Sequence, residues 1–268
     1  MRPWATVLRV PTPVGDVWFK ANMAALAHEG RALRILAARR PDGVVELLAL
    51  DEERGWMLEA DAGESLRERG PDSRAWAAVL ALYGQFQLDL ASGARELVRV
   101  GVPDRRLETL PSQLEQLVEG CADLSPDERR GLLDLPVAGW CEELAALGLP
   151  ETIEHGDLHD GNVFVRDGRY LLLDWGDACV SHPFFTLSIT LRSGRDGMGD
   201  VGRVLDAYLE PFTALAPRRE LVAAVPLARR VGDICGALKW RLIVPNLPPP
   251  HDAEHADIVP ERLRMLLG

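Results

Sequence analysis

The 268-residue sequence predicts an α+β protein with two lobes: a small β-rich N-terminal lobe over residues 1–62 and a larger, mainly helical lobe over 63–268. Three observations support this. Apolar and polar residues alternate in the first sixty positions, helical periodicity begins near residue 72, and one hairpin near residue 165 interrupts the helical part. A chain of this length can bury a sizeable core.

The first lobe begins with "WATVLRVPTPVGDVWFKAN" (4–22), which alternates around a Pro/Gly turn and therefore predicts a two-stranded hairpin. Residues 25–39 place leucines at helical spacing and predict a helix. Short apolar runs at 44–50 and 56–58 predict two more strands. The expected order is strand, strand, helix, strand, strand.

The second lobe contains two clear amphipathic patterns, "AWAAVLALYGQFQLDLA" (75–91) and "VAGWCEELAALG" (137–148), and both predict helices. The interruption is "VFVRDGRYLLL" (163–173). Its turn pair, Asp167 and Gly168, is typical of a two-residue β-hairpin loop. The helical pattern then continues to a Pro-rich stretch and a short terminal helix.

The hairpin has a consequence for the residues just outside its ends, Asn162 and Asp174. Strands rise about 3.3 Å per residue, and a tight turn returns the chain beside its start. We therefore expect these two side chains to lie close together, although twelve positions separate them. Amide and carboxylate oxygens are hard ligands that suit Mg²⁺.

The segment "HGDLHDGN" (155–162) is dense in polar chemistry. Phosphoryl transfer needs a carboxylate to orient the attacking hydroxyl, oxygen ligands for magnesium and a cation on the nucleotide phosphates. Asp157 and Asn162 have the D-x-x-x-x-N spacing of a kinase catalytic loop, and Asp174 in "LLLDWGD" has a D-x-G arrangement with Gly176. We predict a catalytic Asp157, with Asn162 and Asp174 as metal ligands.

Together, "HGDLHDGN" and "LLLDWGD" resemble the aminoglycoside phosphotransferase family, which belongs to a wider group with a protein-kinase-like fold. Protein kinases usually carry an arginine before the catalytic aspartate and a lysine two positions after it, where this chain has Gly156 and His159. This difference favours a small-molecule kinase. The resemblance implies ATP and Mg²⁺ as cofactors and a small hydroxylated substrate, such as an aminoglycoside-like or other cationic compound.

The resemblance extends more loosely into the first lobe. In "VWFKAN", Lys20 would hold the α- and β-phosphates, and Glu29 in the following helix would pair with that lysine. The segment "WMLEADAG" resembles the hinge between the lobes, where the backbone of Glu59, Ala60 and Asp61 would bind adenine.

Two departures from the family pattern bear on these expectations. Only nineteen residues precede Lys20, where related proteins have a further strand and a phosphate-covering loop. The favoured hypothesis is a start inside a longer reading frame, and the alternative is a reduced lobe. In addition, Thr186 stands where the family often has an aspartate, so the sequence does not say what anchors the catalytic loop.

Three other interpretations compete with this one. A protein of the same fold could bind nucleotide without turnover, and a metal-dependent hydrolase could use the His/Asp cluster. The third, a dinucleotide site at "GMGDVG" (197–202), lacks the βαβ unit that such a site needs.

The polar residues around Asp157 are expected to be structural. His155 and His159 have the i, i+4 spacing that serves zinc only on a helix, whereas the glycines beside them indicate a loop. Hydrogen bonding is the expected role of His155, and His159 could also approach the transferred phosphate. Asp160 and Asp177 are expected to be solvated or local turn residues.

The composition of the chain excludes several other functional classes. With 41 acidic and 30 basic residues the formal net charge is −11, and without a Lys/Arg run we expect no nucleic-acid partner. The sequence has no apolar run of about 18 residues and no signal-peptide pattern, which predicts a cytoplasmic protein without a membrane span. Four cysteines without a CxxC pair predict free thiols. Acceptor identity, ATP versus GTP and oligomeric state stay open.

Overall fold

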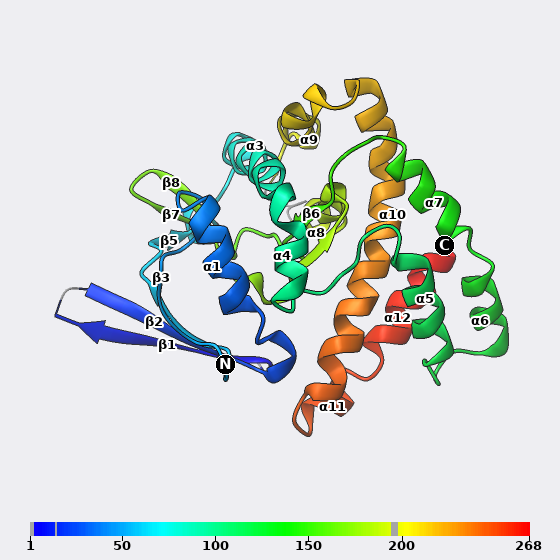
Figure 1. Cartoon of the computed structure of the whole chain (residues 1–268), viewed down its shortest axis with the longest axis horizontal. Coiled ribbons are helices and arrows are strands. Elements are labelled where there is room, and N and C mark those ends of the chain that lie inside the picture. The colour runs from blue at the N-terminus through cyan, green and yellow to red at the C-terminus, as the bar shows by residue number, and fades with distance from the viewer. Residues whose placement is uncertain (1–2, 14, 194–197) are drawn as a thin grey trace.

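A computed structural model describes residues 3–13, 15–193 and 198–268, and within these ranges the fold is α+β as expected. Figure 1 shows the antiparallel sheet of the N-terminal part at one end of the molecule and the helices at the other. The division at residue 62 stays a prediction.

The N-terminal sheet contains β1 (Ala5–Thr12), β2 (Gly15–Asn22), β3 (Leu47–Asp51) and β4 (Trp56–Ala60) in the order β1-β2-β4-β3. All neighbouring strands are antiparallel. Helix α1 (Glu29–Arg39) follows β2 and turns its buried leucines inward. This is the predicted order of elements, and it places Lys20 and Glu29 on adjacent elements.

The register of the sheet decides which side chains share a face. Lys20 lies opposite Met57, and Trp18 lies opposite Glu59. Side chains of directly opposed residues project from the same face, and so do those two positions apart on a strand. Lys20, Trp18 and Glu59 therefore line one face of the sheet, the face that carries the buried Lys20.

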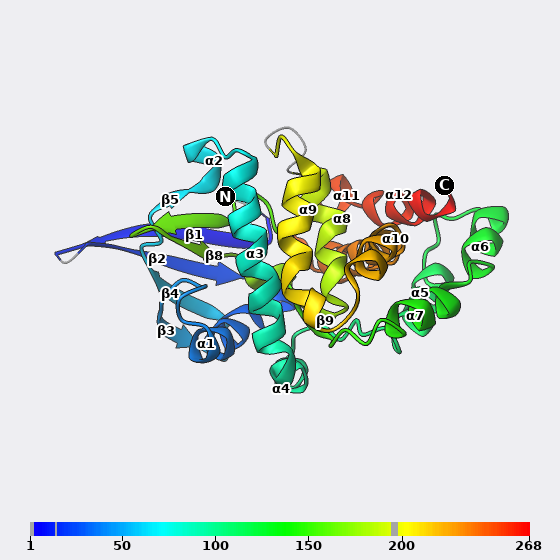
Figure 2. The ribbon, with the colours of Figure 1, turned by 90° about the horizontal axis from the view of Figure 1, so that it is seen from above.

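The remaining helices build the larger part of the molecule. They are α2 (Leu66–Arg69), α3 (Ser73–Leu90), α4 (Ala94–Arg99), α5 (Leu110–Glu119), α6 (Pro126–Leu133), α7 (Val137–Ala145), α8 (Thr186–Ser193), α9 (Val201–Leu209), α10 (Arg218–Ile243), α11 (His251–Glu254) and α12 (Ile258–Arg264). The long α10 runs through the centre of this part (Figure 1) and contacts α5, α7, α8 and α12. Figure 2 shows α3 and α9 side by side, an arrangement that their many contacts confirm.

The two helices predicted at 75–91 and 137–148 are present as α3 and α7. Helix α3 begins at residue 73 because the side chain of Asp72 accepts a hydrogen bond from the Ala75 N–H, which satisfies one of the free N–H groups of the first turn. Its apolar face packs into one continuous core, where the Tyr83 ring stacks on Tyr208 of α9.

Two small sheets carry the loops that matter for the site. β5 (Glu64–Ser65), β7 (Val163–Arg166) and β8 (Arg169–Leu172) form one, and β6 (Thr152–Glu154) pairs with β9 (Cys179–Ser181) in the other. The predicted hairpin is β7–β8. Asp167 and Gly168 have φ of 52° and 75°, the positive values that a two-residue type I′ turn requires.

The "GMGDVG" segment does not open a dinucleotide-binding unit in the part of the chain that the structure describes. Its Gly197 lies outside the described residues, and from residue 198 the chain leads into α9, which Asp200 caps. The elements that follow α9 are helical. None of the helices in the described ranges combines the length and the apolar character that a membrane span needs.

Candidate active site

Lys20 is the centre of a buried charge cluster. Its Nζ donates to Glu29 Oε1 at 2.7 Å and to Asp174 Oδ1 at 2.6 Å. Glu29 also accepts from Asn22 Nδ2 at 2.6 Å and from the Trp175 backbone N–H at 2.8 Å. The structure therefore brings three candidates together and ties β2, α1 and the segment after β8 to one carboxylate.

The charges in this cluster depend on one another. Burial tends to lower the pKa of Lys20, but Glu29 and Asp174 outweigh it and raise that pKa well above its ordinary value. Burial raises the pKa of Glu29, against the opposing charge of Lys20. For Asp174, burial acts upward, yet Lys20 holds the pKa below the usual range. Lys20 and Asp174 are thus both charged near neutral pH.

The backbone of Asn162 lies beside the residue that precedes Asp174, in keeping with the predicted hairpin. The Leu173 N–H donates to the Asn162 carbonyl at 2.9 Å, and Asp174 follows directly with φ of 65°, a left-handed conformation that is strained for a residue with a side chain. Asn162 Nδ2 donates to the Asp157 carbonyl at 3.0 Å. These contacts leave Asn162 Oδ1 and Asp174 Oδ2 without a hydrogen-bond donor among the described residues, and two such oxygens fit a hard divalent cation.

Asp157 lies between two donors. His159 Nε2 lies 3.5 Å from one carboxylate oxygen, and Lys239 Nζ lies 3.8 Å from the other. Because His159 Nδ1 accepts a hydrogen bond from the Gly161 N–H at 3.0 Å, the proton of a neutral ring is on Nε2, which faces Asp157. Burial acts to raise the pKa of Asp157, but His159 and Lys239 outweigh it and hold that pKa well below its usual range.

The sequence patterns did not predict Lys239 as a residue of the site. It comes from α10, and its Nζ donates to Asp177 Oδ2 at 2.8 Å and to the Gly156 carbonyl at 3.2 Å. A signal was available, because only two of the 30 basic residues in the sequence are lysines, and both lie at this site.

Hydroxyl groups anchor the catalytic loop where an aspartate was expected. Thr186 is fully buried and lies 3.4 Å from the Thr190 hydroxyl, which donates to the Leu158 carbonyl at 3.0 Å. On the other side of the loop, the Tyr83 hydroxyl accepts from the His155 backbone N–H at 2.9 Å. The loop is therefore held by neutral hydrogen bonds from α8 and α3.

The two aspartates expected as solvated or local turn residues form ion pairs instead. Asp160 Oδ1 accepts from Arg67 Nε at 2.9 Å and from its Nη2 at 2.6 Å, which joins the catalytic loop to α2. Asp177 pairs with Lys239. Both contacts come from distant parts of the chain, so a local sequence pattern could not predict them.

His155 has a structural environment. It is fully buried, its Nε2 lies 2.9 Å from the Leu173 carbonyl and its ring packs on Trp175 at 4.6 Å between centroids. Burial lowers its pKa to about 4, so the ring is neutral. Within the described ranges no group of three or more His, Cys, Asp or Glu residues is arranged to hold a metal ion.

The hinge candidates lie at the end of β4. The Ala60 N–H donates to the Glu46 carbonyl at 2.9 Å, and the Asp61 carbonyl accepts from Arg166 Nη1. The Ala60 N–H is therefore already used, whereas the Asp61 carbonyl has a second lone pair that can accept another hydrogen bond. Glu59 is buried beside the Lys20 cluster, and burial together with the charge of Glu29 raises its pKa to about 7.

A cavity of about 250 Å³ joins the two charge clusters. Its charged lining is Lys20, Asp157, Asp174, Asp177 and Lys239, and its other lining residues include Trp4, Val7, Leu26, Trp240 and Ile243. It is the candidate active site, since it contains the candidates for nucleophile activation and for phosphate binding together.

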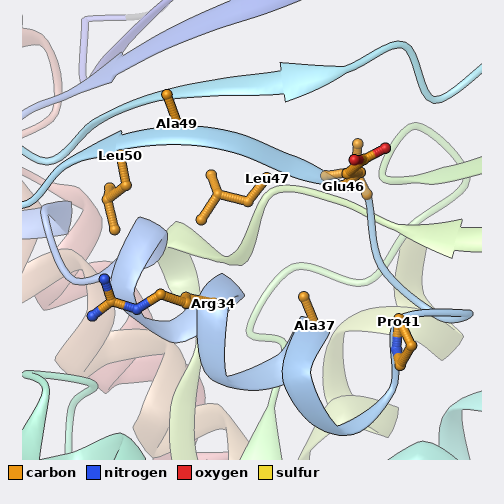
Figure 3. Close-up of a pocket in the computed structure, with 8 residues that line it drawn as sticks. Arg34, Ala37, Pro41, Glu46, Leu47, Ala49 and Leu50 are labelled. Carbon is orange, nitrogen blue, oxygen red and sulfur yellow. The ribbon is translucent and has the colours of Figure 1, made fainter.

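A wider hollow of about 640 Å³ lies elsewhere, between α1 and β3 (Figure 3). The side chains labelled there are Arg34, Ala37, Pro41, Glu46, Leu47, Ala49 and Leu50. None of the catalytic or metal-binding candidates lines this groove. We therefore do not consider it a candidate active site, although its volume is larger.

Comparison with known proteins gives an independent result. Residues 5–221 match the model of a family described as "Phosphotransferase enzyme family". A curated relative, an ATP-dependent helicase/deoxyribonuclease polypeptide of Heliobacterium modesticaldum, is 29% identical over 102 residues. That match spans 35% of this chain and 8% of the relative, so the chain corresponds to a small fraction of that protein.

Solved structures with low identity share the fold. A choline/ethanolamine kinase family protein from Mesorhizobium loti is 18% identical, with 98% of this chain and 88% of that chain covered and a TM-score of 0.60. The APH(2″) enzyme in complex with GDP and kanamycin is 16% identical, with 98% and 91% covered and a TM-score of 0.62. Amicoumacin kinase in complex with AMP-PNP, Ca²⁺ and Ami is 14% identical, with 100% and 86% covered and a TM-score of 0.60. The chain therefore has the protein-kinase-like fold that its motifs imply.

Proposed function

The chain belongs to the phosphotransferase enzyme family, and from this premise we propose that it transfers the γ-phosphoryl group of ATP to a hydroxyl of a small molecule. One observation above all supports this function. One cavity is lined by Lys20, a cation held for phosphates, by Asp174, a magnesium ligand beside it, and by Asp157, a carboxylate for the acceptor hydroxyl. A backbone hydrogen bond joins the second proposed magnesium ligand, Asn162, to the residue before Asp174.

In the proposed reaction, the acceptor hydroxyl lies against Asp157, whose two carboxylate oxygens have loose neighbours at 3.5 and 3.8 Å. The acceptor oxygen forms a bond to the γ-phosphorus, the bond from that phosphorus to the β,γ-bridging oxygen breaks, and ADP leaves. Asp157 orients the hydroxyl and accepts its proton. Since Asp157 stays ionised, it is ready for this role at neutral pH.

The nucleotide would lie under the N-terminal sheet. Lys20 faces the α- and β-phosphates, and Trp18, on the same face of β2, offers a ring on which adenine can stack. Asn162 and Asp174 would hold Mg²⁺, which neutralises phosphate charge when bound. The complexes of the APH(2″) enzyme with GDP and of amicoumacin kinase with AMP-PNP support nucleotide use at this fold.

The acceptor is proposed to be a small hydroxylated cation. Among the described residues, Asp157 and Asp177 outnumber the single cation of the acceptor side, Lys239, which pairs with Asp177. The Trp4 and Trp240 rings line the same cavity. Indole faces attract cations. The relatives named for choline/ethanolamine and for kanamycin act as a guide to the compounds worth testing.

The test is a screen of hydroxyl compounds coupled to ADP release, with the native protein, Asp157→Ala and Asp174→Ala in parallel. We expect product with the native protein and loss of product in both variants, while circular dichroism shows that all three are folded. Undiminished product in either variant would refute the assigned roles. Binding of Mg·ATP with no transfer to any acceptor would favour a nucleotide-binding protein without turnover.

A further inference from the structure

Lysine occurs at two positions in this chain, and every other basic residue is an arginine. Only Lys20 and Lys239 are lysines among 30 basic residues, so the protein uses arginine wherever a surface cation serves. Both lysines are buried, and both line the active-site cavity. A lysine ammonium is a compact point charge with three donors on a flexible stem, whereas a guanidinium is a wide planar fork. We infer from the presence of lysine at these two positions that the cavity needs the compact ammonium charge rather than a guanidinium group.

The hydrogen bonds of Lys239 are incomplete. Its Nζ donates to Asp177 Oδ2 at 2.8 Å and to the Gly156 carbonyl at 3.2 Å. An ammonium group has three N–H donors, and the remaining neighbour, Asp157 Oδ1, is 3.8 Å away, beyond the range of about 2.7–3.2 Å for an N–H···O bond. One donor is therefore available to a group that enters beside Asp157.

The charge on Lys239 is maintained. Burial tends to lower its pKa, but Asp177 and Asp157 outweigh burial and raise that pKa above its ordinary value. The side chain is 10% exposed, and the exposed part faces a cavity that Asp157 and Asp174 also line. A fixed, mostly desolvated cation with a free donor is what a developing phosphoryl charge requires.

The two lysines have different carboxylate neighbours in the cavity. Lys20 pairs with Asp174, on the metal and nucleotide side, and Lys239 is the cation beside Asp157, on the acceptor side. A phosphoryl group that moves from the nucleotide to a hydroxyl held by Asp157 must come next to Lys239. Negative charge is spread over its equatorial oxygens during transfer.

We propose that Lys239 is a second catalytic cation, whose free N–H binds an oxygen of the transferred phosphoryl group as it reaches the acceptor. This inference rests on the proposed function.

Chemical labelling of the native protein tests the contact without turnover. In an ATP analogue with an acyl group on its terminal phosphate, a nearby lysine reacts through the fraction of its side chain that has lost a proton to the alkaline buffer. The neutral amine attacks the acyl carbon and forms an amide, the bond from that carbon to the phosphate oxygen breaks, and ATP and the second amine proton are released. With only two lysines in the chain, peptide mass spectrometry assigns each site without ambiguity. We expect label on Lys239 that excess Mg·ATP suppresses. Label on Lys20 with none on Lys239 would overturn the proposal.

Kinetics supply the second readout. For Lys239→Met we expect kcat to fall about 100- to 1000-fold, with KM for the nucleotide within about twofold of native, because the contact forms mainly in the transition state. Arg241→Met is the matched control, an exposed position on the same helix, and should leave kcat unchanged. A native kcat in Lys239→Met contradicts the inference.

The two arms separate this inference from the proposed function. Transfer by the native protein with Lys239 unlabelled and Lys239→Met fully active refutes the role of Lys239 alone. Labelled Lys239 in a protein that phosphorylates no acceptor refutes the proposed function and leaves the phosphate contact standing. If Lys239→Met fails to fold, the labelling of the native protein still decides.

Discussion

The two lysine clusters of the active site differ in how tightly they are closed. Around Lys20, both carboxylates lie within 2.7 Å of the ammonium, and Glu29 has further donors on both of its oxygens. Around Lys239, one carboxylate is at 2.8 Å and the other at 3.8 Å. The side proposed for the nucleotide is thus pre-organised by short ion pairs, and the side proposed for the acceptor has a looser arrangement of charges.

The largest expected effects separate the two sides by what they bind. Asp157→Asn should lower the rate of transfer by about 10²–10⁴-fold while the Kd of Mg·ATP stays near native, because only acceptor activation is lost. Asp174→Asn should lower the rate as well and also weaken Mg·ATP binding. Single-turnover kinetics and nucleotide titration measure the two quantities. Equal nucleotide affinity in both variants would contradict the proposal that Asp174 binds the nucleotide and Asp157 binds the acceptor.

Lys20→Met tests how closed the nucleotide side is. It leaves Glu29 buried without its cation, which should lower the free energy of unfolding by about 3–5 kcal/mol. Adding Glu29→Gln to this variant should recover part of the loss, because the uncompensated charge is gone. Urea denaturation measures both. A Lys20→Met protein as stable as the native one would mean that this cluster is not tightly coupled.

Glu59, which is buried beside the Lys20 cluster, should make the stability of the protein depend on pH. Its pKa is about 7 in the folded protein against 4.5 ordinarily, so between these values the folded state keeps a proton that the unfolded chain has released. Stability from this group is therefore present at low pH and is lost as pH rises through about 7. Glu59→Gln should be more stable than the native protein at pH 8, by up to about 3 kcal/mol, and no different near pH 4. Thermal unfolding at the two pH values checks this, and a pH-independent difference would refute it.

The smallest effect concerns the acceptor-side backbone. Gly156 has φ of +74°, and a Cβ there would lie 2.1 Å from the Asp177 carbonyl oxygen. Gly168 has nearly the same φ of +75° but open space around it, so it controls for conformation alone. We expect Gly156→Ala to cost about 2 kcal/mol more than Gly168→Ala in denaturant unfolding. Equal costs would show that the Asp177 segment yields easily.

The nucleotide side could be predicted from the sequence because its residues belong to local patterns. The predicted hairpin put Asn162 near Asp174, and the predicted order of a strand followed by a helix put Lys20 near Glu29. The acceptor side could not, since Lys239 lies 83 positions from Gly156 and reaches it only through the packing of α10.

Other misses have the same cause. The ion pair of Asp160 with Arg67 spans 93 positions, and the hydroxyl network around Thr186 depends on three packed elements rather than on a motif. Several short helices have too few residues to show a periodic pattern, so their positions came only from the structure.

A crystal structure with Mg²⁺ and AMP-PNP tests the proposed site most directly. We expect the metal between Asn162 and Asp174, and the terminal phosphate between Lys20 and Lys239 next to the Asp157 carboxylate. A nucleotide bound outside this cavity, or a metal held by other residues, would contradict this expectation.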